Sequence, residues 1–246
     1  MLLAIDIGNT NISFGVFRGN RIIKRFNIPT REVIHSRRGR LNVPYGKLIN
    51  DAIICSVVPE ATKIIERGLK PLIKIKPYIL GKNVSVPIKN LYRKPSQVGQ
   101  DRLVNAYAGL TLYGAPLVVV DFGTAITFDV ISKNGAYLGG MILPGLRISL
   151  AALSQQTALL PLVKLCNPKE LIGRDTKYSI LSGIIYGYAA LTDGMIGKIK
   201  RKIGKNALVI STGGNANLVS KYCTEITKID GDLTLMGLNF IYRNLV

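Results

Sequence analysis

The sequence predicts an α/β protein of two similar domains, each made of strands followed by helices. Two observations predict it. Residues 5–14 (IDIGNTNISF) are echoed by residues 120–128 (VDFGTAITF): each is an apolar strand ending in Asp, a Gly turn, a Thr and a second strand. A turn signal at residues 113–116 (YGAP) separates the repeats. We therefore expect domains at 1–115 and 116–246.

In the first half, apolar runs are joined by turns at Gly8-Asn9 and Gly19-Asn20, both of which are typical of hairpins. Later, Leu103, Ala106, Tyr107 and Leu110 form an apolar stripe at helical spacing. The expected elements are strands 2–7, 12–17, 21–28 and 52–57, one or two short strands within 71–86, and helices 60–69 and 101–113.

In the second half the strand pattern restarts, and the turn Lys133-Asn134-Gly135 corresponds to the earlier Gly19-Asn20. Gly183 and Gly187 lie four residues apart on one predicted helix face, which permits either a close helix crossing or a subunit contact. The expected elements are strands 116–122, 125–132, 136–140 and 208–211, and helices 146–153, 177–203, 234–244 and one beginning at 216.

The composition is that of a globular protein, with 48% apolar and 19% charged residues in 246. No apolar run reaches the 18 or more residues of a membrane span, and the N-terminus lacks the pattern of a secretory signal. The sequence has three cysteines, Cys55, Cys166 and Cys223. An odd number without zinc-ligand spacing argues against a disulfide framework or a zinc site, so we expect three thiols buried by packing. These features predict a cytoplasmic protein without a membrane partner.

The charge is strongly positive, at +19 with an isoelectric point near 10.0. Such a surface attracts anions, including ATP and nucleic acid. Basic residues cluster at 31–40 (with Arg37, Arg38 and Arg40) and at 198–205, but aromatic residues are not interleaved with them as in single-strand binding platforms. We interpret the charge as a solvated surface, so nucleic-acid binding is unlikely. His35 is expected to be an exposed loop residue and a poor catalytic candidate.

Three carboxylates are candidates for chemistry. Asp6 and Asp121 lie at matching places, each at the end of a strand before a Gly turn, where a carboxylate can bind a cation or orient a reacting group. The alternative for Asp6 is an Asx turn that satisfies its own backbone. Asp101 lies where a helix begins, so its alternative role is a helix N-cap.

The glycine turns indicate phosphate binding, because they expose backbone N–H groups. Residues 139–145 (GGMILPG) and 212–215 (TGGN) could also approach a ligand, the second at a helix N-terminus. The sequence has no GxxxxGK[ST] motif, no protein-kinase motif set and no GxSxG, and a single His leaves no hydrolase triad. The residues therefore favour phosphoryl transfer by another class of nucleotide-binding protein.

The chain resembles the type III pantothenate kinases of the acetate kinase, sugar kinase, Hsp70 and actin superfamily. Each motif of the resemblance is unspecific alone, but their order is specific. In sequence order they are residues 6–11 (DIGNTN), 56–59 (SVVP), 99–102 (GQDR), 121–125 (DFGTA), 139–145, 157–161 (TALLP), 172–176 (IGRDT), 182–183 (SG), 212–214 (TGG) and 233–235 (LTL).

This resemblance implies ATP-dependent phosphorylation of pantothenate on its primary hydroxyl, the first step towards coenzyme A. It implies two ribonuclease-H-like (actin-like ATPase) domains facing a central cleft, in a homodimer. The implied cofactors are ATP with Mg²⁺ and a monovalent cation, K⁺ or NH₄⁺.

The resemblance also implies residue roles. Asp101 would be the general base and Asp121 would bind the monovalent cation. ATP would be held by Asp6, Ile7, Gly8, Asn9, Thr10, Asn11, Ile12, Ser13 and Thr124. Pantothenate would be held by Tyr92, Gly99, Gln100, Asp101 and Arg102, and by Thr176 of the partner subunit.

The chain departs from the family pattern at two places. Gln100 stands where relatives often have a small residue, and the short basic stretch 28–51 matches no family motif. The remaining alternatives are another small-molecule kinase of the same superfamily and a basic nucleic-acid-binding or regulatory protein.

Overall fold

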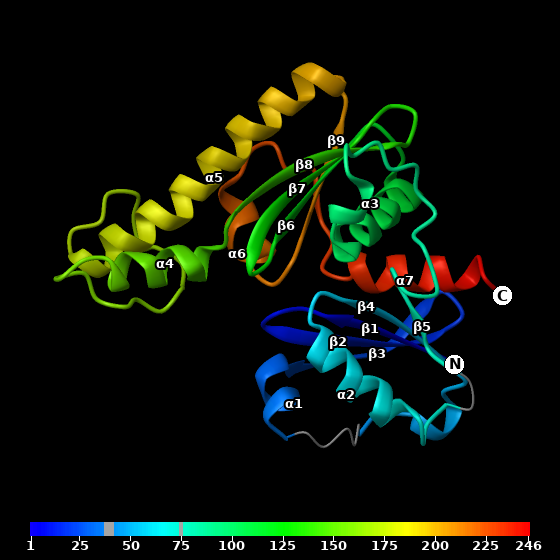
Figure 1. Ribbon diagram of the computed structural model, residues 1–246. Helices are drawn as coiled ribbons and strands as arrows, with labels where there is room; N and C mark the ends of the chain where they lie inside the picture. The colour runs from blue at the N-terminus through cyan, green and yellow to red at the C-terminus, as the bar shows by residue number, and fades with distance from the viewer. Residues whose placement is uncertain (37–41, 74–75) are drawn as a thin grey trace. The chain divides into compact units, whose positions relative to one another are not determined.

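The computed structural model describes residues 1–36, 42–73 and 76–246, which form two compact units (Figure 1). The first unit contains Met1–Ile88, Arg93–Ala108 and Asp232–Val246, and the second contains Lys89–Tyr92 and Gly109–Gly231. The C-terminal segment joins the first unit because its helix packs on the first sheet. The predicted boundary at residue 115 does not assign this C-terminal segment to the first unit. The division into domains 1–115 and 116–246 stays a prediction.

The sheet of the first unit has the order β3-β2-β1-β4-β5 in the described chain. The hairpin pairs β1 antiparallel with β2 and β2 with β3, whereas β4 is parallel to β1 and β5 to β4. Alternating side chains of β1 are buried on both faces, as expected of a central strand. The strands are β1 (Leu2–Ile7), β2 (Asn11–Arg18), β3 (Arg21–Pro29), β4 (Asp51–Ser56) and β5 (Tyr78–Ile79).

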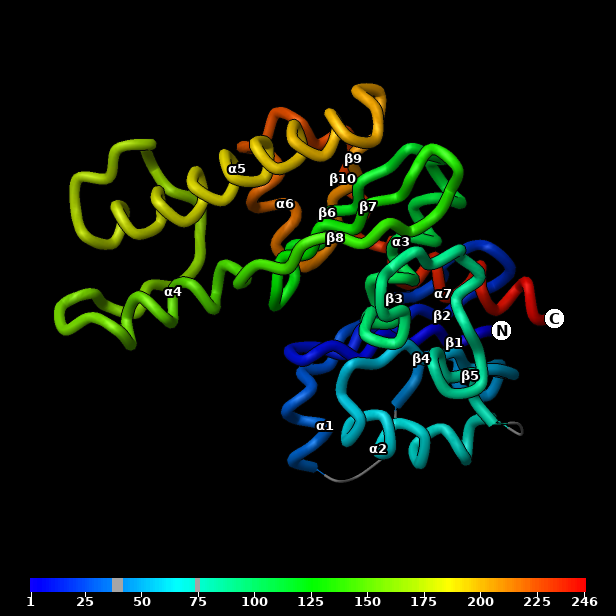
Figure 2. The backbone as a smooth tube through the Cα atoms, turned by 45° about the horizontal axis from the view of Figure 1, so that its top comes forward, coloured from blue at the N-terminus to red at the C-terminus, as the bar shows by residue number. Residues whose placement is uncertain are grey.

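Helices cover both faces of the first sheet (Figure 1 and Figure 2). On one face, α1 and α2 enclose a cluster that includes Ile5, Phe14 and Ile65. On the other face, α7 and the start of α3 enclose a cluster that includes Cys55 and Leu238. The helices are α1 (Thr30–Ser36), α2 (Pro59–Leu69), α3 (Gln100–Tyr113) and α7 (Leu233–Arg243), with 3-10 turns η1 (Gly46–Leu48) and η2 (Pro95–Gln97).

The sheet of the second unit has the order β10-β9-β6-β7-β8 in the described chain, so it repeats the arrangement of the first. Asp121 pairs with Thr127 across β6 and β7, in the place where Asp6 pairs with Ser13 across β1 and β2. The sequence repeat is therefore a repeat of strand register. The strands are β6 (Leu117–Phe122), β7 (Ala125–Ile131), β8 (Tyr137–Pro144), β9 (Leu208–Thr212) and β10 (Lys228–Ile229).

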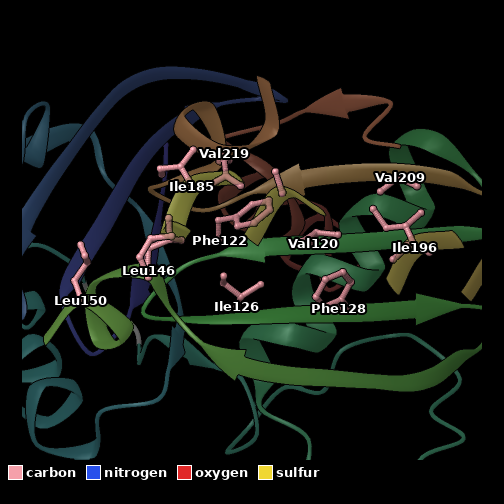
Figure 3. Close-up of a cluster of buried hydrophobic side chains, with 14 of the residues drawn as sticks. Val120, Phe122, Ile126, Phe128, Leu146, Leu150, Ile185, Ile196, Val209 and Val219 are labelled. Carbon is pink, nitrogen blue, oxygen red and sulfur yellow. The ribbon is translucent and has the colours of Figure 1, made fainter. Parts of the chain in front are cut away.

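The core of the second unit lies between this sheet and helices α4 and α5, with Phe122, Ile126, Leu146 and Ile185 among its side chains (Figure 3). The helices are α4 (Leu146–Gln155), α5 (Thr176–Ile203) and α6 (Ala216–Val219), with the 3-10 turn η3 (Ser220–Tyr222). By length and composition α5 could cross a membrane, but one of its faces packs in this core, as in a core helix of a soluble protein.

Most predicted elements are present within one to four residues of their expected ends, and the predicted α/β class is confirmed. The sequence analysis missed α1 and β10. His35 is exposed as predicted, but it lies on α1 rather than in a loop. The prediction of three buried thiols holds for Cys55, is wrong for Cys166, which is exposed in the loop before α5, and holds only in part for Cys223, which is half-buried. Arg37, Arg38 and Arg40 of the first basic cluster lie outside the described residues.

Candidate functional site

The turn between β1 and β2 carries the first group of predicted ATP ligands. Asp6 and Ile7 end β1, and the turn closes with a hydrogen bond from the Gly8 N–H to the Asn11 carbonyl at 3.0 Å. Asn9 and Thr10 are exposed at its tip, while Ile12 and Ser13 continue into β2. An exposed Gly turn with a carboxylate beside it can present N–H groups to phosphate.

Thr30, which the sequence analysis did not select, holds this turn in place. Its hydroxyl donates to the Gly8 carbonyl at 2.7 Å and its N–H donates to the Thr10 carbonyl at 3.0 Å. The residue is only 1% exposed. Because two carbonyls of the turn are engaged by Thr30, they are directed away from a ligand on the other side. A Thr after Pro29 is a helix-start signal, but no sequence pattern shows that it contacts residues 20 positions earlier.

We expect Thr30→Val to raise the KM for ATP about tenfold, because one hydrogen bond that fixes the turn is lost from a buried position. Thr30→Ser keeps the hydroxyl and should restore most of the affinity. Steady-state kinetics with each substrate varied would measure both. Equal ATP KM values in the two variants would show that the hydroxyl does not position the turn.

The end of β4 lies beside the same turn. The Val57 N–H donates to the Ile7 carbonyl at 3.1 Å, which ties the two strand ends together. Ser56 accepts the Thr62 hydroxyl at 2.6 Å and the Val58 N–H at 3.0 Å, so the SVVP motif fixes the first turn of α2. This motif therefore has a structural explanation within the first unit.

Asp101 lies in the first turn of α3, and Gly99 precedes that helix. The Oδ1 atom of Asp101 accepts the Arg102 N–H at 2.9 Å. A Cβ on Gly99 would collide with this oxygen, so only glycine leaves room for the carboxylate. Burial raises the pKa of Asp101, and the Arg102 N–H and positive charge oppose that rise only in part. Asp101 is the second residue of α3 rather than its N-cap, and burial disfavours its charged form.

Both residues that flank Asp101 are packed against the protein rather than free in solvent. Arg102 is 8% exposed, and its positive charge opposes the effect of burial on the pKa of Asp101. Gln100 packs on Gly81, since a Cβ there would lie 3.2 Å from the Gln100 Cγ. The Gln100 side chain is therefore held by packing at this position.

Cys55, on β4, lies near two of the predicted carboxylates. It pairs with Asp6 in the β1–β4 register and is fully buried. Burial raises the pKa of its thiol well above the usual range, and the charges of Asp6 and Asp101 raise it further. Asp6 is therefore the strand neighbour of a buried thiol whose pKa the charge of Asp101 also raises. The sequence analysis assigned Cys55 to packing and gave no sign of this position.

The second unit holds the matching turn between β6 and β7. Asp121 is half-buried and Thr124 is exposed. Gly213 lies against the Asp121 carboxylate and the Phe122 backbone, where a Cβ would clash with both. The Asn215 N–H donates to the Phe122 carbonyl at 3.1 Å. The TGGN element therefore encloses the predicted cation ligand, while residues 139–144 of the other glycine-rich element lie in strand β8.

Two further predicted ligands lie in the second unit. Tyr92 stacks on the backbone of β8 at Gly139, and its N–H donates to the Asn90 side chain at 2.9 Å. Thr176 is the exposed first residue of α5, whose N-cap Asp175 accepts the Tyr178 N–H at 2.8 Å. The predicted residues thus divide by unit: residues 6–13 and 99–102 lie in the first, and Tyr92, Asp121, Thr124 and Thr176 in the second.

Comparisons with known proteins agree with the sequence motifs. The family model of type III pantothenate kinase matches residues 2–198. A type III pantothenate kinase of Syntrophus aciditrophicus is 41% identical over 253 residues, covering 99% of each chain. That of Agathobacter rectalis is 39% identical, covering 99% of this chain and 97% of its own.

Solved structures show the fold. A Campylobacter jejuni protein assigned to the Baf family of transcriptional activators has a TM-score of 0.65 at 21% identity, covering 99% of this chain and 98% of its own. A Sinorhizobium meliloti protein assigned as a 2-dehydro-3-deoxygalactonokinase has a TM-score of 0.59 at 11% identity, covering 100% and 99%. The chain therefore shares its α/β fold with these two proteins.

Proposed function

The chain belongs to the type III pantothenate kinase family, so it is an ATP-dependent kinase that phosphorylates pantothenate in coenzyme A biosynthesis, and we propose that Asp101 is the base of this reaction. The observation that carries the proposal is a half-buried carboxylate with a raised pKa, next to Arg102, at the start of α3. A carboxylate with a raised pKa is a stronger base than a solvated aspartate.

The proposed reaction is direct transfer. Asp101 accepts the proton of the primary hydroxyl as that oxygen bonds to the γ-phosphorus, and the bond to the leaving ADP breaks. Arg102 binds the pantothenate carboxylate, since a guanidinium donates two parallel hydrogen bonds. Phosphoryl transfer requires mainly positioning and charge neutralisation, so the protein needs little covalent chemistry of its own.

We propose that the two repeated turns bind ATP. The turn would donate the N–H groups of Asn9 and Thr10 to phosphate, since the Gly8 N–H already bonds the Asn11 carbonyl. The hydrogen bonds from Thr30 to the carbonyls of the turn support this orientation. Thr124 is exposed at the matching turn and has a hydroxyl suited to a phosphate oxygen. The kinase family implies a divalent metal with the nucleotide, which neutralises phosphate charge.

We propose that Asp121 binds the monovalent cation. Its carboxylate lies at a strand end, enclosed by the Gly213 backbone at a place that a Cβ would fill. A carboxylate supplies the oxygen ligands that a hard cation prefers, so Asp121 fits such an ion. When bound, the cation would supply positive charge to the phosphate region.

We propose a homodimer in which Thr176 acts on the pantothenate site of the partner subunit. Exposed apolar side chains gather in the loop before α5, and Leu159 is 91% exposed. On α5, Gly183 and Gly187 are exposed, and a Cβ on either would meet open space. An apolar region beside a flat helix face is typical of a subunit contact. The other exposed apolar residues of the loop are Leu162, Leu171 and Ile172.

A mixing experiment tests the composite site. We expect Asp101→Asn and Thr176→Val each to be impaired as homodimers. Unfolding and refolding them together should recover about a quarter of wild-type turnover, because half of randomly formed dimers are mixed and each holds one intact site. Sedimentation would verify the dimer. Recovery no greater than the sum of the separate variants would contradict a site shared between subunits.

The function itself is tested by following labelled γ-phosphate. We expect transfer from ATP to pantothenate, faster with K⁺ or NH₄⁺ than with Na⁺, and no transfer to a panel of sugars. We propose that this reaction takes place in the cytoplasm, where ATP is present. Transfer to a sugar, or none to pantothenate, would contradict the proposed function.

A further inference from the structure

A carboxylate that the proposed mechanism does not use is buried in the second unit. Asp129 of β7 is 0% exposed. Its Oδ1 accepts the hydroxyl of Tyr137 at 2.8 Å, and its Oδ2 accepts the hydroxyl of Thr127 at 3.0 Å. Tyr137, on β8, is itself fully buried. Burying a carboxylate is costly unless its oxygens are hydrogen-bonded, so this group needs an explanation beyond packing.

The repeat shows that the fold does not require a carboxylate here. Asp129 pairs with Val119, two residues before Asp121. The matching residue in the first sheet pairs with Ala4, two residues before Asp6, and it is Gly15. Leu235 of α7 packs over Gly15, since a Cβ there would lie 3.2 Å from it. One sheet thus has an apolar contact where the other has a buried aspartate and tyrosine.

Tyr137 also forms the backbone contact that holds the segment Lys89–Tyr92, named here the strap. The Tyr137 N–H donates to the Lys89 carbonyl at 2.8 Å, and the Leu91 N–H donates to the Tyr137 carbonyl at 2.9 Å. These bonds add the strap to the edge of β8. The strap belongs to the second unit, although the chain on either side of it belongs to the first.

The same part of β8 fixes the last residue of the strap. The ring of Tyr92 lies on Gly139, where a Cβ would be 3.2 Å from its Cδ2. Tyr92 is therefore positioned in two ways. The backbone hydrogen bonds between the strap and Tyr137 hold its segment, and its own ring contacts Gly139, two residues further along β8. A rotation or shift of Tyr137 would move both supports of Tyr92 together.

We propose that Tyr137, anchored by Asp129, is a positioning residue that holds the strap and so sets the place of Tyr92 against the acceptor substrate. The inference rests on the proposed function, because it takes Tyr92 as a pantothenate contact. The hydroxyl of Tyr137 acts through Asp129 and the strap and does not touch the substrate. Its loss should therefore weaken acceptor binding and leave the nucleotide and the base unaffected.

The test compares Tyr137→Phe with Tyr113→Phe. The first keeps the buried ring and removes only the hydroxyl. The second removes a part-buried tyrosine–aspartate bond in the same unit, from Tyr113 to Asp230 at 2.7 Å, and neither residue belongs to the strap or to β8. We expect Tyr137→Phe to raise the KM for pantothenate about tenfold, the effect of one hydrogen bond to a charged group, with kcat and the KM for ATP near wild type. Tyr113→Phe should change none of these constants.

Hydrogen–deuterium exchange supplies a second readout that does not depend on the substrate. The Leu91 amide should exchange faster in Tyr137→Phe than in wild type or Tyr113→Phe. Unchanged exchange at Leu91, or the same pantothenate KM in both variants, would overturn the proposal. If the wild-type protein fails to phosphorylate pantothenate, the proposed function fails, while the exchange result still decides whether Tyr137 holds the strap.

Discussion

Replacing Asp101 by asparagine should lower kcat by about 10²- to 10⁴-fold, the usual contribution of a positioned general base. Asparagine has the same shape and can still accept the Arg102 N–H, but it cannot take the hydroxyl proton. ATP should therefore bind with unchanged affinity. Steady-state kinetics and nucleotide titration measure the two quantities. Unchanged turnover would refute the assignment of the base.

The stability of this variant separates a catalytic carboxylate from a structural one. Burial raises the pKa of Asp101, so folding favours its protonated form. Its stabilising contribution is present below the pKa of the unfolded chain and is lost as pH rises through the higher pKa of the folded protein. At neutral pH, asparagine should leave the free energy of unfolding unchanged or raised. A clear loss in urea denaturation would instead indicate a structural role.

The pH dependence of catalysis should also reflect the raised pKa of Asp101. A base must be ionised, so kcat/KM for pantothenate should fall as pH is lowered through the raised pKa of Asp101. The acid limb of the profile should therefore lie at higher pH than the titration of a solvated aspartate. That limb should be absent from the residual activity of the asparagine variant.

Replacing Asp121 by asparagine should lower turnover about 10²-fold, comparable to the loss of one group that stabilises charge in an active site. The variant should also lose its response to K⁺, because a neutral amide in the same cradle binds a cation more weakly than a carboxylate. Turnover measured across a K⁺ series at constant ionic strength tests both. A variant that K⁺ still activates as it does the wild type would contradict the assignment.

A matched substitution controls for the loss of a carboxylate from the second unit. Asp193 accepts the N–H and hydroxyl of Thr224 at 2.7 and 2.8 Å, and the Glu225 N–H at 3.0 Å. Asp193→Asn should therefore reduce stability without changing the response to K⁺. If both variants lose that response equally, the effect is structural and Asp121 has no special role.

The strands and their turns could be predicted from the sequence because local patterns determine them. The repeated Asp and Gly after an apolar run fixed β1, β2, β6 and β7, and their register follows from burial of alternate side chains. That α7 belongs to the first unit could not be predicted in this way. Its packing on the first sheet depends on contacts such as Leu235 with Gly15, between residues more than 200 positions apart.

The residues of the candidate site that lie in sequence motifs could be predicted. The single residues that support them from elsewhere in the chain could not. Asp6 and Asp101 lie in motifs, but Cys55, whose pKa both charges raise, lies in an ordinary apolar strand. Thr30 contacts the first turn from the start of α1, and Tyr137 contacts the strap from β8. Such residues act through long-range hydrogen bonds, for which a single sequence has no periodic signal.

The most direct test of the central claim is a crystal structure with pantothenate and a non-hydrolysable ATP analogue. The account predicts that the primary hydroxyl of pantothenate lies within about 2.6–3.2 Å of a carboxylate oxygen of Asp101. It also predicts that Arg102 binds the pantothenate carboxylate. A hydroxyl bound to another carboxylate, with Asp101 remote from it, would contradict the account.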